Sequence, residues 1–471
     1  MKRRLRVYKK TVSIVNETAT GMYESLVGDK KGFLLESYDK NYDRYTFFGK
    51  EPEEIISSRG NALVITKNDG TQEVRNGNPL ERLKEYYSEF DIVKDNEELS
   101  FSGGLVGNLG YDFVRYAEVL PDNNPDEIGI ETVQMMLMTK FIMVDHVAET
   151  LTGIILGEDT PEGRKKSLEE AEELIRQALA NKGRAPEKNF THDGVIVNQS
   201  DSLEQYSQKV EKIKEYIREG HIFQTVLSQR WTIETKQSGF ELYKELRELN
   251  PSPYLYYFNY GDFEVIGSSP EMIVKQQGNR VYTCPIAGTR KRGADAEEDA
   301  LLRDELLQDE KERAEHVMLV DLARNDMGRI SEFGTVKVTQ FMEVQNYSHV
   351  MHIVSMVEGR KKGEFHPLDL VSSFLPAGTL SGAPKIRAME IIDELESVRR
   401  GLYGGATGYI DFSGDMDFCI TIRTMIKKGK RVYLQAGAGI VADSIPENEY
   451  QECCNKVMAL AKTLVNVSST L

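Results

Sequence analysis

The sequence predicts an α+β fold with largely antiparallel sheets. Strand-like runs come in adjacent groups, whereas a parallel sheet would need strands and helices to alternate strictly. Strands dominate up to about residue 150, and strands and helices then mix irregularly. No repeat with a period of about 20–50 residues is evident, which argues against a repeat architecture.

The first part of the chain contains clear strand patterns separated by turn residues. These are GFLLESYD from Gly32, RYTFFGK from Arg44 and ALVITKN from Ala62. The segment SGGLVGNLGYD, from Ser102 to Asp112, carries four glycines and indicates tight turns or a close approach of two backbones. It lacks the GK[ST] ending of a phosphate-binding loop.

A change in composition marks the expected domain boundary. Residues Thr160 to Lys182 have apolar side chains at helical spacing, and the polar segment NKGRAPEKNFTHDG from Asn181 to Gly194 reads as a linker. We therefore expect an N-terminal domain at 1–185 and a second domain at 195–466.

Beyond the linker the periodicity predicts both kinds of element. Helices are expected at Ser202–Glu219, Phe240–Leu249, Glu297–Leu322, Pro384–Glu394 and Pro446–Leu464. Strands are expected at Tyr254–Tyr260, Glu264–Ser268, Arg280–Cys284, Gly408–Asp411, Phe418–Thr424 and Val432–Ala436.

Composition excludes several classes of protein. The 471 residues allow two or three domains, 40% of them are hydrophobic, and no run approaches the roughly 20 apolar residues of a membrane helix. The basic start MKRRLRVYKK has no apolar region after it, so no secretory signal is expected. The four cysteines form no CxxC pair, which fits a reduced, cytoplasmic protein. The net charge of −16 argues against nucleic-acid binding, and an anionic substrate would need a local positive potential.

Two carboxylate pairs are candidates for a metal site. Glu312 and Glu315 lie three residues apart in ERAEHVML, and Glu449 and Glu452 have the same spacing in ENEYQECCNK. Each pair shares one face of an expected helix, and oxygen ligands suit Mg²⁺. A solvated helix face is the alternative for both pairs, and His316 fits a local hydrogen bond better than a ligand role.

Two segments could bind an anion through backbone amides, and a third has basic residues after a Gly-Thr turn. PAGTLSGAPKIRAMEII, from Pro376, leads small residues into a helix with Lys385 near its start. QAGAGIV, from Gln435, suggests a glycine turn at the end of a strand, and PIAGTRKRG, from Pro285, a Gly-Thr turn before a basic loop. A capped helix start and ligand-free turns remain the alternatives.

Two single residues complete the local observations. His352 lies in the strand-like SHVMHIVS, where a buried histidine with a hydrogen-bond partner is the alternative to a functional one. Arg423 lies in the apolar ITIRT, so a buried guanidinium there would need either a substrate carboxylate or a structural Asp or Glu.

Taken together, these segments resemble the chorismate-utilising enzymes. This family includes component I of anthranilate synthase and of aminodeoxychorismate synthase, and the isochorismate and salicylate synthases. The resemblance implies an intertwined two-domain fold of large antiparallel β-sheets with helices packed outside. The matching motifs run in family order over roughly 201–464 and are IFQTVLSQR, NPSPY, GSSPE, PIAGTR, EKERAEHVMLVDLARND, YSHVMHIVS, GTLSGAPKIRAME, YGGATGY, IRT, QAGAGIV and DSIPENEYQE.

The family's metal and substrate positions transfer to this chain by motif. Mg²⁺ would bind among Glu312, Glu315, Glu449 and Glu452, with only a subset in direct contact. The ring carboxylate of chorismate would meet the Mg²⁺ and the amides of the glycine segment, and the enolpyruvyl carboxylate would meet an arginine and a tyrosine. The implied substrate residues are Gly288, Thr289, Thr379, Gly382, Tyr403, Arg423, Gly437, Ala438, Gly439 and Lys456.

The resemblance also assigns catalytic roles. Glu271 in GSSPE occupies the position of the general acid that protonates the leaving C4 hydroxyl, which requires a raised pKa. His352 matches the position tied to elimination of pyruvate. Gln224 and Ala287 stand where other members carry a water-activating or a nucleophilic lysine. With neither lysine, external ammonia is the implied nucleophile, which favours the anthranilate-forming members. A lysine-free aminodeoxychorismate synthase component I is the alternative.

The resemblance further implies a regulator and a partner. The segments LLES and NPSPY match those that form the tryptophan feedback site, and the implied contacts are Leu35, Glu36, Ser37, Asn250, Pro253 and Tyr254. No GxCxG nucleophile turn is present, so a separate glutamine amidotransferase subunit is expected to supply ammonia within a hetero-oligomer. A catalytically silent amino-acid sensor is the alternative from another class.

Overall fold

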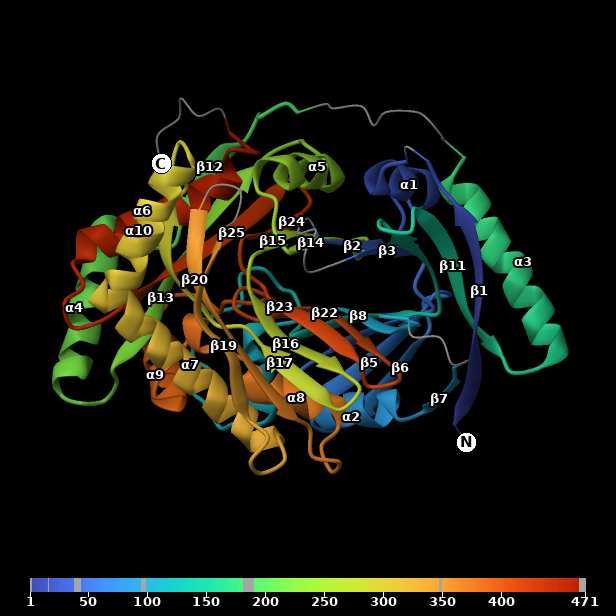
Figure 1. Cartoon of the computed structure of the whole chain (residues 1–471), viewed down its shortest axis with the longest axis horizontal. Coiled ribbons are helices and arrows are strands. Elements are labelled where there is room, and N and C mark those ends of the chain that lie inside the picture. The colour runs from blue at the N-terminus through green and yellow to red at the C-terminus, as the bar shows by residue number, and fades with distance from the viewer. Residues whose placement is uncertain are drawn as a thin grey trace.

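The computed structural model describes residues 2–15, 17–37, 44–94, 99–180, 190–346 and 350–465. Two large sheets face each other, and most helices lie on their outer surfaces (Figure 1). The mixture of helices with mainly antiparallel strands confirms the predicted α+β class. No helix in the described ranges is long and apolar enough to cross a membrane.

The first sheet has 13 strands in the described part of the chain. All its pairings are antiparallel except β1 with β7. In spatial order the strands are β12 (Val195–Gln199), β13 (Gln224–Glu234), β25 (Arg431–Ile440), β24 (Thr424–Lys428), β15 (Glu264–Ser269), β14 (Tyr254–Asn259), β2 (Gly32–Glu36), β3 (Tyr45–Lys50), β10 (Lys140–Asp145), β11 (Thr150–Glu158), β1 (Arg3–Ser13) and β7 (Phe90–Val93), with β21 (Gly382–Ala383) also paired to β13.

The second sheet has 12 strands among the described residues. Its pairings are antiparallel throughout. In spatial order the strands are β18 (Ile286–Lys291), β20 (Val350–Arg360), β17 (Arg280–Thr283), β16 (Met272–Gln277), β23 (Met416–Ile420), β22 (Ala406–Asp411), β8 (Gly104–Leu109), β9 (Val133–Met138), β4 (Glu54–Ser58), β5 (Ala62–Lys67) and β6 (Gln72–Asn76), with β19 (Lys337–Asn346) also paired to β20.

Four of the five helices predicted beyond the linker begin and end close to the predicted positions. Local capping explains several starts: Ser202 and Gln205 form a capping box on α4, and Thr160 precedes a proline at the start of α3. The helices are α1 (Ala19–Leu26), α2 (Pro79–Tyr87), α3 (Pro161–Ala178), α4 (Leu203–Arg218), α5 (Gly239–Leu249), α6 (Ala296–Gln308), α7 (Glu310–Ile330), α8 (Pro367–Phe374), α9 (Lys385–Leu395) and α10 (Pro446–Ala461), with 3₁₀ turns η1 (Tyr111–Tyr116) and η2 (Gly378–Leu380).

One predicted helix is wrong in its length. The segment expected as a single helix at Glu297–Leu322 forms α6 and α7, which are separated at Asp309. Asp309 has an extended backbone, and its carboxylate accepts hydrogen bonds from the amides of Lys311 and Glu312. The Asp309 side chain therefore caps the start of α7, and the chain does not continue as one helix. The pattern of polar residues in the sequence does not reveal this break.

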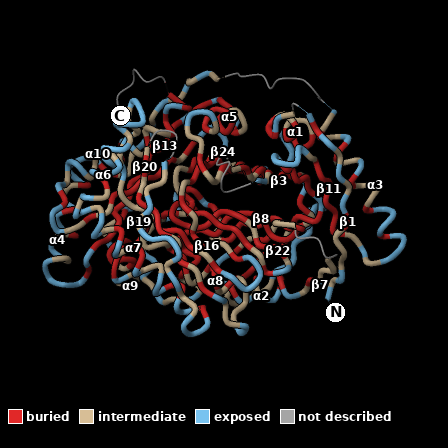
Figure 2. Tube along the Cα trace, viewed as in Figure 1, coloured by how far each residue is buried: buried red, intermediate tan, exposed pale blue. Residues whose placement is uncertain are grey.

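Three apolar layers hold the sheets and helices together. One layer lies between the first sheet and helices that include α4, α5 and α10, and a second lies between the second sheet and helices that include α7 and α8. The third lies between the two sheets and includes Phe33, Phe258 and Val106. Neighbouring residues such as Phe33 and Leu34 point to opposite layers, as the two-residue period of a strand requires. Buried positions accordingly concentrate along the sheets (Figure 2).

Both sheets combine strands from the two halves of the chain. In the first sheet, β2 pairs with β14, and in the second, β8 pairs with β22. Glycines of β8 make this second contact possible: a Cβ on Gly104 would lie 2.2 Å from the carbonyl oxygen of Ile410. The glycine-rich segment therefore serves close backbone approach. The division at 1–185 and 195–466 stays a prediction, and residues 181–189 and 466 lie outside the described ones.

Candidate active site

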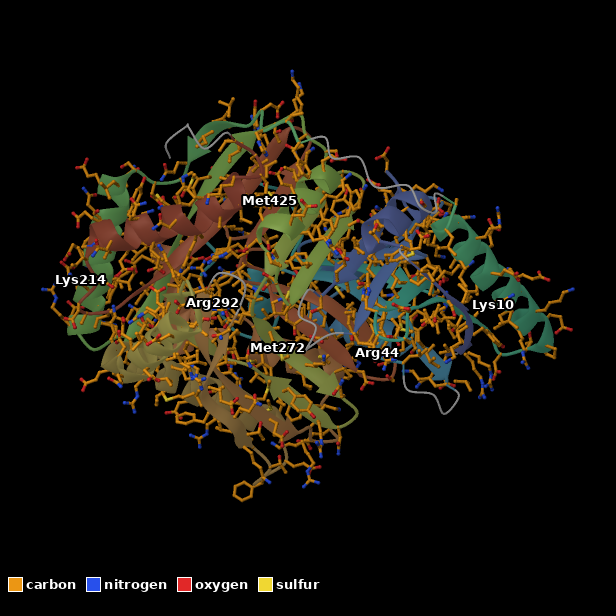
Figure 3. The ribbon with its side chains drawn as sticks, turned by 45° about the horizontal axis from the view of Figure 1, so that its top comes forward. Lys10, Arg44, Lys214, Met272, Arg292 and Met425 are labelled. Carbon is orange, nitrogen blue, oxygen red and sulfur yellow. The ribbon has the colours of Figure 1, made fainter. Side chains whose placement is uncertain are left out.

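Two short links carry the chain from one sheet to the other, side by side. The link after β15 contains Glu271 and enters β16, and the link after β23 contains Arg423 and enters β24. The amide of Ile420 donates to the carbonyl of Glu271 at 2.9 Å, and the amide of Ser268 donates to the carbonyl of Arg423 at 3.1 Å. The region lies near the centre of the molecule, as the labelled Met272 shows (Figure 3).

The predicted strand at Phe418–Thr424 is therefore wrong. Strand β23 ends at Ile420, and Arg423 has a left-handed backbone with φ of 51° where the chain changes sheets. The apolar residues on both sides are buried in different sheets, which a single-strand reading of the sequence cannot distinguish. Non-glycine residues adopt this backbone conformation at a cost, so the turn is held by its surroundings.

Glu271 is a buried carboxylic acid. Its side chain accepts a hydrogen bond from the Thr379 hydroxyl at 3.1 Å, and burial raises its pKa to about 8 despite the opposing influence of Thr379 and Lys456. A cavity of about 40 Å³ adjoins it, with an apolar wall that includes Leu319 and Phe374. At neutral pH this side chain therefore carries a proton that it can donate.

Arg423 offers a half-buried guanidinium to the site. None of the described carboxylates lies within 4.0 Å of its nitrogens. Burial lowers its pKa, and the phenol of the buried Tyr403 and the carboxylate of Glu452 act in the opposite direction. Of the two partners expected from the sequence, a structural Asp or Glu is thus not found in direct contact, and an external anion fits this position.

The segment QAGAGIV is part of strand β25, so the predicted glycine turn is wrong. Gly437 pairs with Ser228 and Gly439 with Val226 on β13, whereas the pairing with β24 stops at Leu434. The amides of Ser228 and Val226 point away from β25, to Glu396 and Ser381.

Because these two pairs exchange no backbone hydrogen bonds, the N–H and C=O groups of Gly437 and Gly439 point to the open edge beyond Leu434. Lys456 lies on that edge. Its Nζ donates to the carbonyl of Gly437 at 2.8 Å and lies 2.6 Å from Glu452. Ala438 lies between the two glycines and is fully buried. This edge therefore presents two amides and one ammonium group.

Two glycines, one on each side of β13, make room for Gln224. A Cβ on Gly439 would lie 2.6 Å from Nε2 of the buried Gln224, and a Cβ on Gly382 would lie 2.2 Å from the carbonyl of Gln224. Gly382 also has φ of 142°, which L-residues rarely adopt. The Gln224 amide lies within hydrogen-bond reach of Glu315 and so connects this edge to the first carboxylate pair.

His352 lies on β20, and its Nδ1 faces strand β18. Its Nδ1 lies 2.7 Å from the carbonyl of Gly288 and 3.1 Å from the hydroxyl of Thr289. Burial lowers its pKa, with a smaller effect from nearby Arg423 in the same direction. The ring is therefore neutral at neutral pH, with its proton on Nδ1 facing a carbonyl that can only accept, and Nε2 carries the lone pair. Residues 347–349 of the same motif lie outside the described ones.

The four candidate metal ligands come from two helices. Glu312 and Glu315 lie in the first turns of α7, and Glu449 and Glu452 lie in the first turns of α10. Burial raises the pKa values of Glu312, Glu315 and Glu449, and the charge of Glu452 acts on all three in the same direction. Carboxylates that repel one another fit a hard divalent cation. No group of three or more His, Cys, Asp or Glu side chains in the described ranges is close enough to hold a metal ion alone.

Two other predicted features have structural partners. His316 is fully buried, its Nε2 lies 2.6 Å from the Ser355 hydroxyl, and burial lowers its pKa to about 4. It therefore makes a hydrogen bond, as expected, but with a residue of β20 and not with a local partner. Lys385 lies 2.7 Å from the carboxylate of Asp326. Its ammonium is therefore neutralised within the protein, and the anion site considered at the start of α9 loses its cation.

The expected basic loop at PIAGTRKRG is also wrong. Residues Ile286–Lys291 form strand β18, which pairs with β20 around a bulge between Ala287 and Arg290. Arg290 pairs with Glu305 and Asp309, and Arg292 pairs with Asp299. Gly288 lies in the bulge with φ of 67°, and a Cβ there would lie 3.3 Å from Oε2 of Glu312. The bulge thus brings Gly288 and Thr289 beside the carboxylates.

A separate cavity of about 870 Å³ contains most of the predicted regulatory residues. Leu35, Glu36, Ser37, Pro253 and Tyr254 line it. Asn250 is outside this lining, and its carbonyl accepts a hydrogen bond from Ser268. The cavity wall also includes Arg44, which is labelled in Figure 3. The structure thus brings LLES and NPSPY together across the pairing of β2 with β14.

The sequence did not predict a buried ion pair that adjoins the candidate active site. Glu396 and Arg400 are 5% and 2% exposed, and their side chains meet at 2.6 Å. The only local signal is the run ELESVRRGLYGG, in which two arginines precede a glycine-rich segment. That run does not indicate which arginine is buried, because Arg399 bonds instead to the half-exposed Asp122 and to the carbonyl of Asn124.

Comparison with known proteins decides the family. The family model for chorismate binding enzymes matches residues 33–462. Component 1 of anthranilate synthase from Acetivibrio thermocellus is 44% identical over 458 residues, which cover 95% of this chain and 93% of that protein. The chain belongs to the anthranilate synthase component I family of chorismate-binding enzymes. Component 1 from Bacillus subtilis strain 168 is 42% identical and covers 92% of this chain and 87% of that protein.

Solved structures agree with the fold of this chorismate-binding enzyme. The crystal structure of anthranilate synthase component I from Streptococcus pneumoniae has a TM-score of 0.78 at 39% identity, over 89% of this chain and 92% of that one. The menaquinone-specific isochorismate synthase from Escherichia coli has a TM-score of 0.72 at 17% identity, over 98% of this chain and 94% of that one. The second likeness concerns the fold alone. The resemblance to this family and the fold class predicted from the sequence are confirmed.

The raised pKa of Glu271 predicts a specific dependence of stability on pH. Because the folded state holds a proton up to about pH 8, whereas an ordinary glutamate loses it near 4.5, Glu271 contributes stability below pH 4.5 that is lost as the pH rises through about 8. Urea midpoints measured from pH 5 to pH 9 should therefore fall more steeply for the wild type than for Glu271→Gln. The exposed Glu447→Gln variant should follow the wild type, and parallel curves for Glu271→Gln and wild type would refute a raised pKa.

Proposed function

We propose that this chain aminates chorismate at C2 with ammonia and then eliminates pyruvate to give anthranilate, as component I of an anthranilate synthase. The observation that carries the proposal is the adjacent placement of two links, one of which carries a protonated Glu271 and the other the guanidinium of Arg423. A leaving hydroxyl needs a proton donor and a carboxylate substrate needs a cation, and these links supply both. Relatives that are 40–44% identical to the chain carry the corresponding name.

Chorismate is a dianion, and the site offers positive potential at two places. Arg423, with Tyr403 beside it, would hold the enolpyruvyl carboxylate. The amides of Gly437 and Gly439 and the ammonium of Lys456 would face the ring carboxylate from the open edge of β25. Gly288, Thr289, Thr379 and Gly382 would line the remaining wall. An acidic protein can in this way bind an acidic substrate through a few local groups.

The chemistry follows from the protonation states. As ammonia attacks C2, the ring double bonds shift and the C4–O bond breaks, and Glu271 gives its proton to the departing hydroxyl. In the second step the C2 hydrogen leaves as a proton, the C3–O bond breaks and the ring becomes aromatic. His352 is neutral, with its lone pair on Nε2, and so is suited to accept that proton. Enolpyruvate then takes a proton and becomes pyruvate.

Mg²⁺ is the proposed cofactor. Glu312, Glu315, Glu449 and Glu452 would hold it, because their oxygens are hard ligands and their mutual repulsion would be relieved. When bound, the cation would neutralise the ring carboxylate and polarise the ring. The protein alone supplies an incomplete set of ligands in the described ranges, which leaves positions for a substrate carboxylate and water.

Removing one carboxylate should weaken metal binding. Glu449→Gln is expected to reduce Mg²⁺ affinity at least about tenfold, equivalent to about 1.4 kcal/mol, as measured by titration calorimetry with chorismate present. Glu447 lies two residues away on the same helix and is exposed, so Glu447→Gln is the matched control and should bind as the wild type does. Equal affinities for the two variants would remove Glu449 from the metal site.

The product distinguishes this proposal from the alternatives. Incubation of the chain with chorismate, Mg²⁺ and ammonium at high pH, where free ammonia is available, should yield fluorescent anthranilate. Accumulation of an unaromatised aminochorismate would favour an aminodeoxychorismate synthase, and binding of tryptophan without turnover would favour a silent sensor. Ala287 and Gln224, in place of the lysines of other members, and TLSG at 379–382 favour anthranilate.

His352 should control the second step more than the first. In His352→Met the proton acceptor is lost while ammonia addition remains possible, so aminodeoxyisochorismate should accumulate and anthranilate formation should slow by about 10²-fold or more. Chromatography of the reaction mixture would detect both compounds. The exposed His221→Met is a control expected to leave both rates unchanged. Normal anthranilate formation by His352→Met would exclude the assigned role.

Ammonia for this reaction would come from a glutamine amidotransferase subunit. All four cysteines are buried, and burial raises the pKa values of Cys284 and Cys453 to about 12 and those of Cys419 and Cys454 above the ordinary range. A thiolate that could attack glutamine is therefore not formed at neutral pH. We propose a hetero-oligomer with such a subunit, and a cytoplasmic location in keeping with the unpaired thiols.

Tryptophan is the proposed ligand of the 870 Å³ cavity. Its wall combines apolar side chains such as Leu35 and Pro253 with charged ones of both signs, such as Asp417 and Arg44, which suits a zwitterion with an aromatic ring. Glu36 is neutralised from behind by Arg247 at 3.0 Å. The Ser37 hydroxyl has no hydrogen-bond partner among the described residues, so it can bond to a ligand.

Narrowing this cavity should relieve inhibition without changing the chemistry. Ser37→Leu is expected to weaken tryptophan binding at least about tenfold, because it removes the hydroxyl and fills space. The kcat of the ammonia reaction should stay within about twofold of the wild type. Calorimetry and inhibition curves test both statements, with the exposed Ser88→Leu as control. Unchanged inhibition in Ser37→Leu would place the tryptophan site elsewhere.

A further inference from the structure

None of the described strands pairs with residues 226–230 of β13 on the edge opposite β25. On that edge β21 pairs with Gln224 and Thr225, and β12 pairs with residues from Trp231 onward. Between them, the carbonyl of Val226 and the amide of Ser228 point into the protein interior. Unpaired backbone groups at such a depth are costly, so something must take the place of a strand.

The buried pair of Arg400 and Glu396 fills this gap. Nη2 of Arg400 donates to the carbonyl of Val226 at 2.9 Å, and Oε1 of Glu396 accepts from the amide and hydroxyl of Ser228 at 2.8 and 2.7 Å. Arg400 also donates to both carboxylate oxygens of Glu396 through Nε and Nη2. Val226 and Ser228 are the residues paired with Gly439 and Gly437, so the pair supports the proposed substrate amides from behind.

The same guanidinium reaches two further parts of the site. Its Nη1 donates to the carbonyl of Leu380 at 2.6 Å, next to Thr379, whose hydroxyl binds Glu271. Its carbon lies 5.7 Å from the ring centre of Tyr403 and 4.5 Å from that of Tyr111. One planar group thus connects the strand that backs the amides, the loop that carries Thr379 and the tyrosine beside Arg423.

We infer that Arg400 is a positioning residue for the reaction, with Glu396 as the carboxylate that orients it. This inference rests on the proposed function of the site. Burying two charges gains little stability on balance, because the cost of removing them from water offsets their attraction. A guanidinium fork can instead satisfy two carbonyls and a carboxylate in fixed directions, which lysine cannot do. All three guanidinium nitrogens of Arg400 donate to protein acceptors, so we assign its effect to the groups that it holds and not to contact with the substrate.

The experiment compares Arg400→Lys with a matched ion-pair variant. Arg115 pairs with Asp393 at 2.9 Å and with Asp112 outside the site, so Arg115→Lys is the control. In Arg400→Lys, a shift of the site by a fraction of an ångström to an ångström should lower kcat/KM for chorismate by about 10²-fold. Arg115→Lys should stay within about twofold of the wild type. Both variants are compared at equal folded fraction, measured by circular dichroism.

The pH profile separates positioning from loss of structure. The hydrogen bond from Thr379 lowers the pKa of Glu271, so displacement of Thr379 in Arg400→Lys should raise that pKa. The high-pH limb of kcat/KM, with ammonia counted as free NH₃, should then move to higher pH. Glu396→Gln should show the same direction with a smaller loss, because its shape is kept.

Three outcomes would overturn the inference. In the first, kcat and KM of Arg400→Lys stay within about twofold of the wild type and the high-pH limb of kcat/KM does not move. In the second, the loss of activity in Arg400→Lys is strictly proportional to the unfolded fraction. In the third, Arg115→Lys loses as much activity as Arg400→Lys. The wild-type chain in the same assay tests the proposed function by its product. Chorismate consumption by each variant relative to wild type tests the positioning role, whatever that product is.

Discussion

Two backbone hydrogen bonds between neighbouring crossovers are the constraint on which the rest of this structure depends. The amide of Ile420 binds the carbonyl of Glu271, and the amide of Ser268 binds the carbonyl of Arg423. Each crossover leads from one sheet into the other. The first bond extends the ladder between β23 and β16, and the second extends the ladder between β24 and β15, so the acid and the guanidinium are placed where the two sheets are linked. A change that separated the sheets would separate these two groups as well, so fold and site form one unit.

The negative charge of the protein explains why several positive groups are needed at the candidate active site. The chain has a net charge of −16, and four further carboxylates gather at the site, so the unassisted potential there opposes an anion. Arg423, Lys456 and the amides of β25 oppose this locally, and a divalent cation among the carboxylates would reverse it. Glu271 differs from these four carboxylates, because burial keeps its carboxyl group neutral at neutral pH. Similar side chains thus receive different roles from their surroundings.

Much of this arrangement could be predicted from the sequence, because its signals are local. Glutamates three apart on a helix share a face, and motifs in a fixed order indicate a family. The failures have a common physical cause, since each depends on contacts with distant segments. The glycines of β25 are extended because β13 runs beside them, and Arg423 lies in a crossover because its two apolar flanks are buried in different sheets. The roles of Arg400 and Glu396 could not be predicted, because they depend on which part of the β13 edge has no strand beside it. Only the three-dimensional structure shows that the pair bonds to Val226 and Ser228 there.

The burial of every cysteine has a practical consequence for studying motion in this protein. Cys284, Cys419, Cys453 and Cys454 are each less than 8% exposed and hold their protons tightly, so thiol-reactive dyes and spin labels find little thiolate to attack. A cysteine introduced on the surface would be the preferred target without deletion of the native ones. Pairs of such labels on α7 and α10 would report the distance between the two helices, free and with ligands, in a background that is spectroscopically silent.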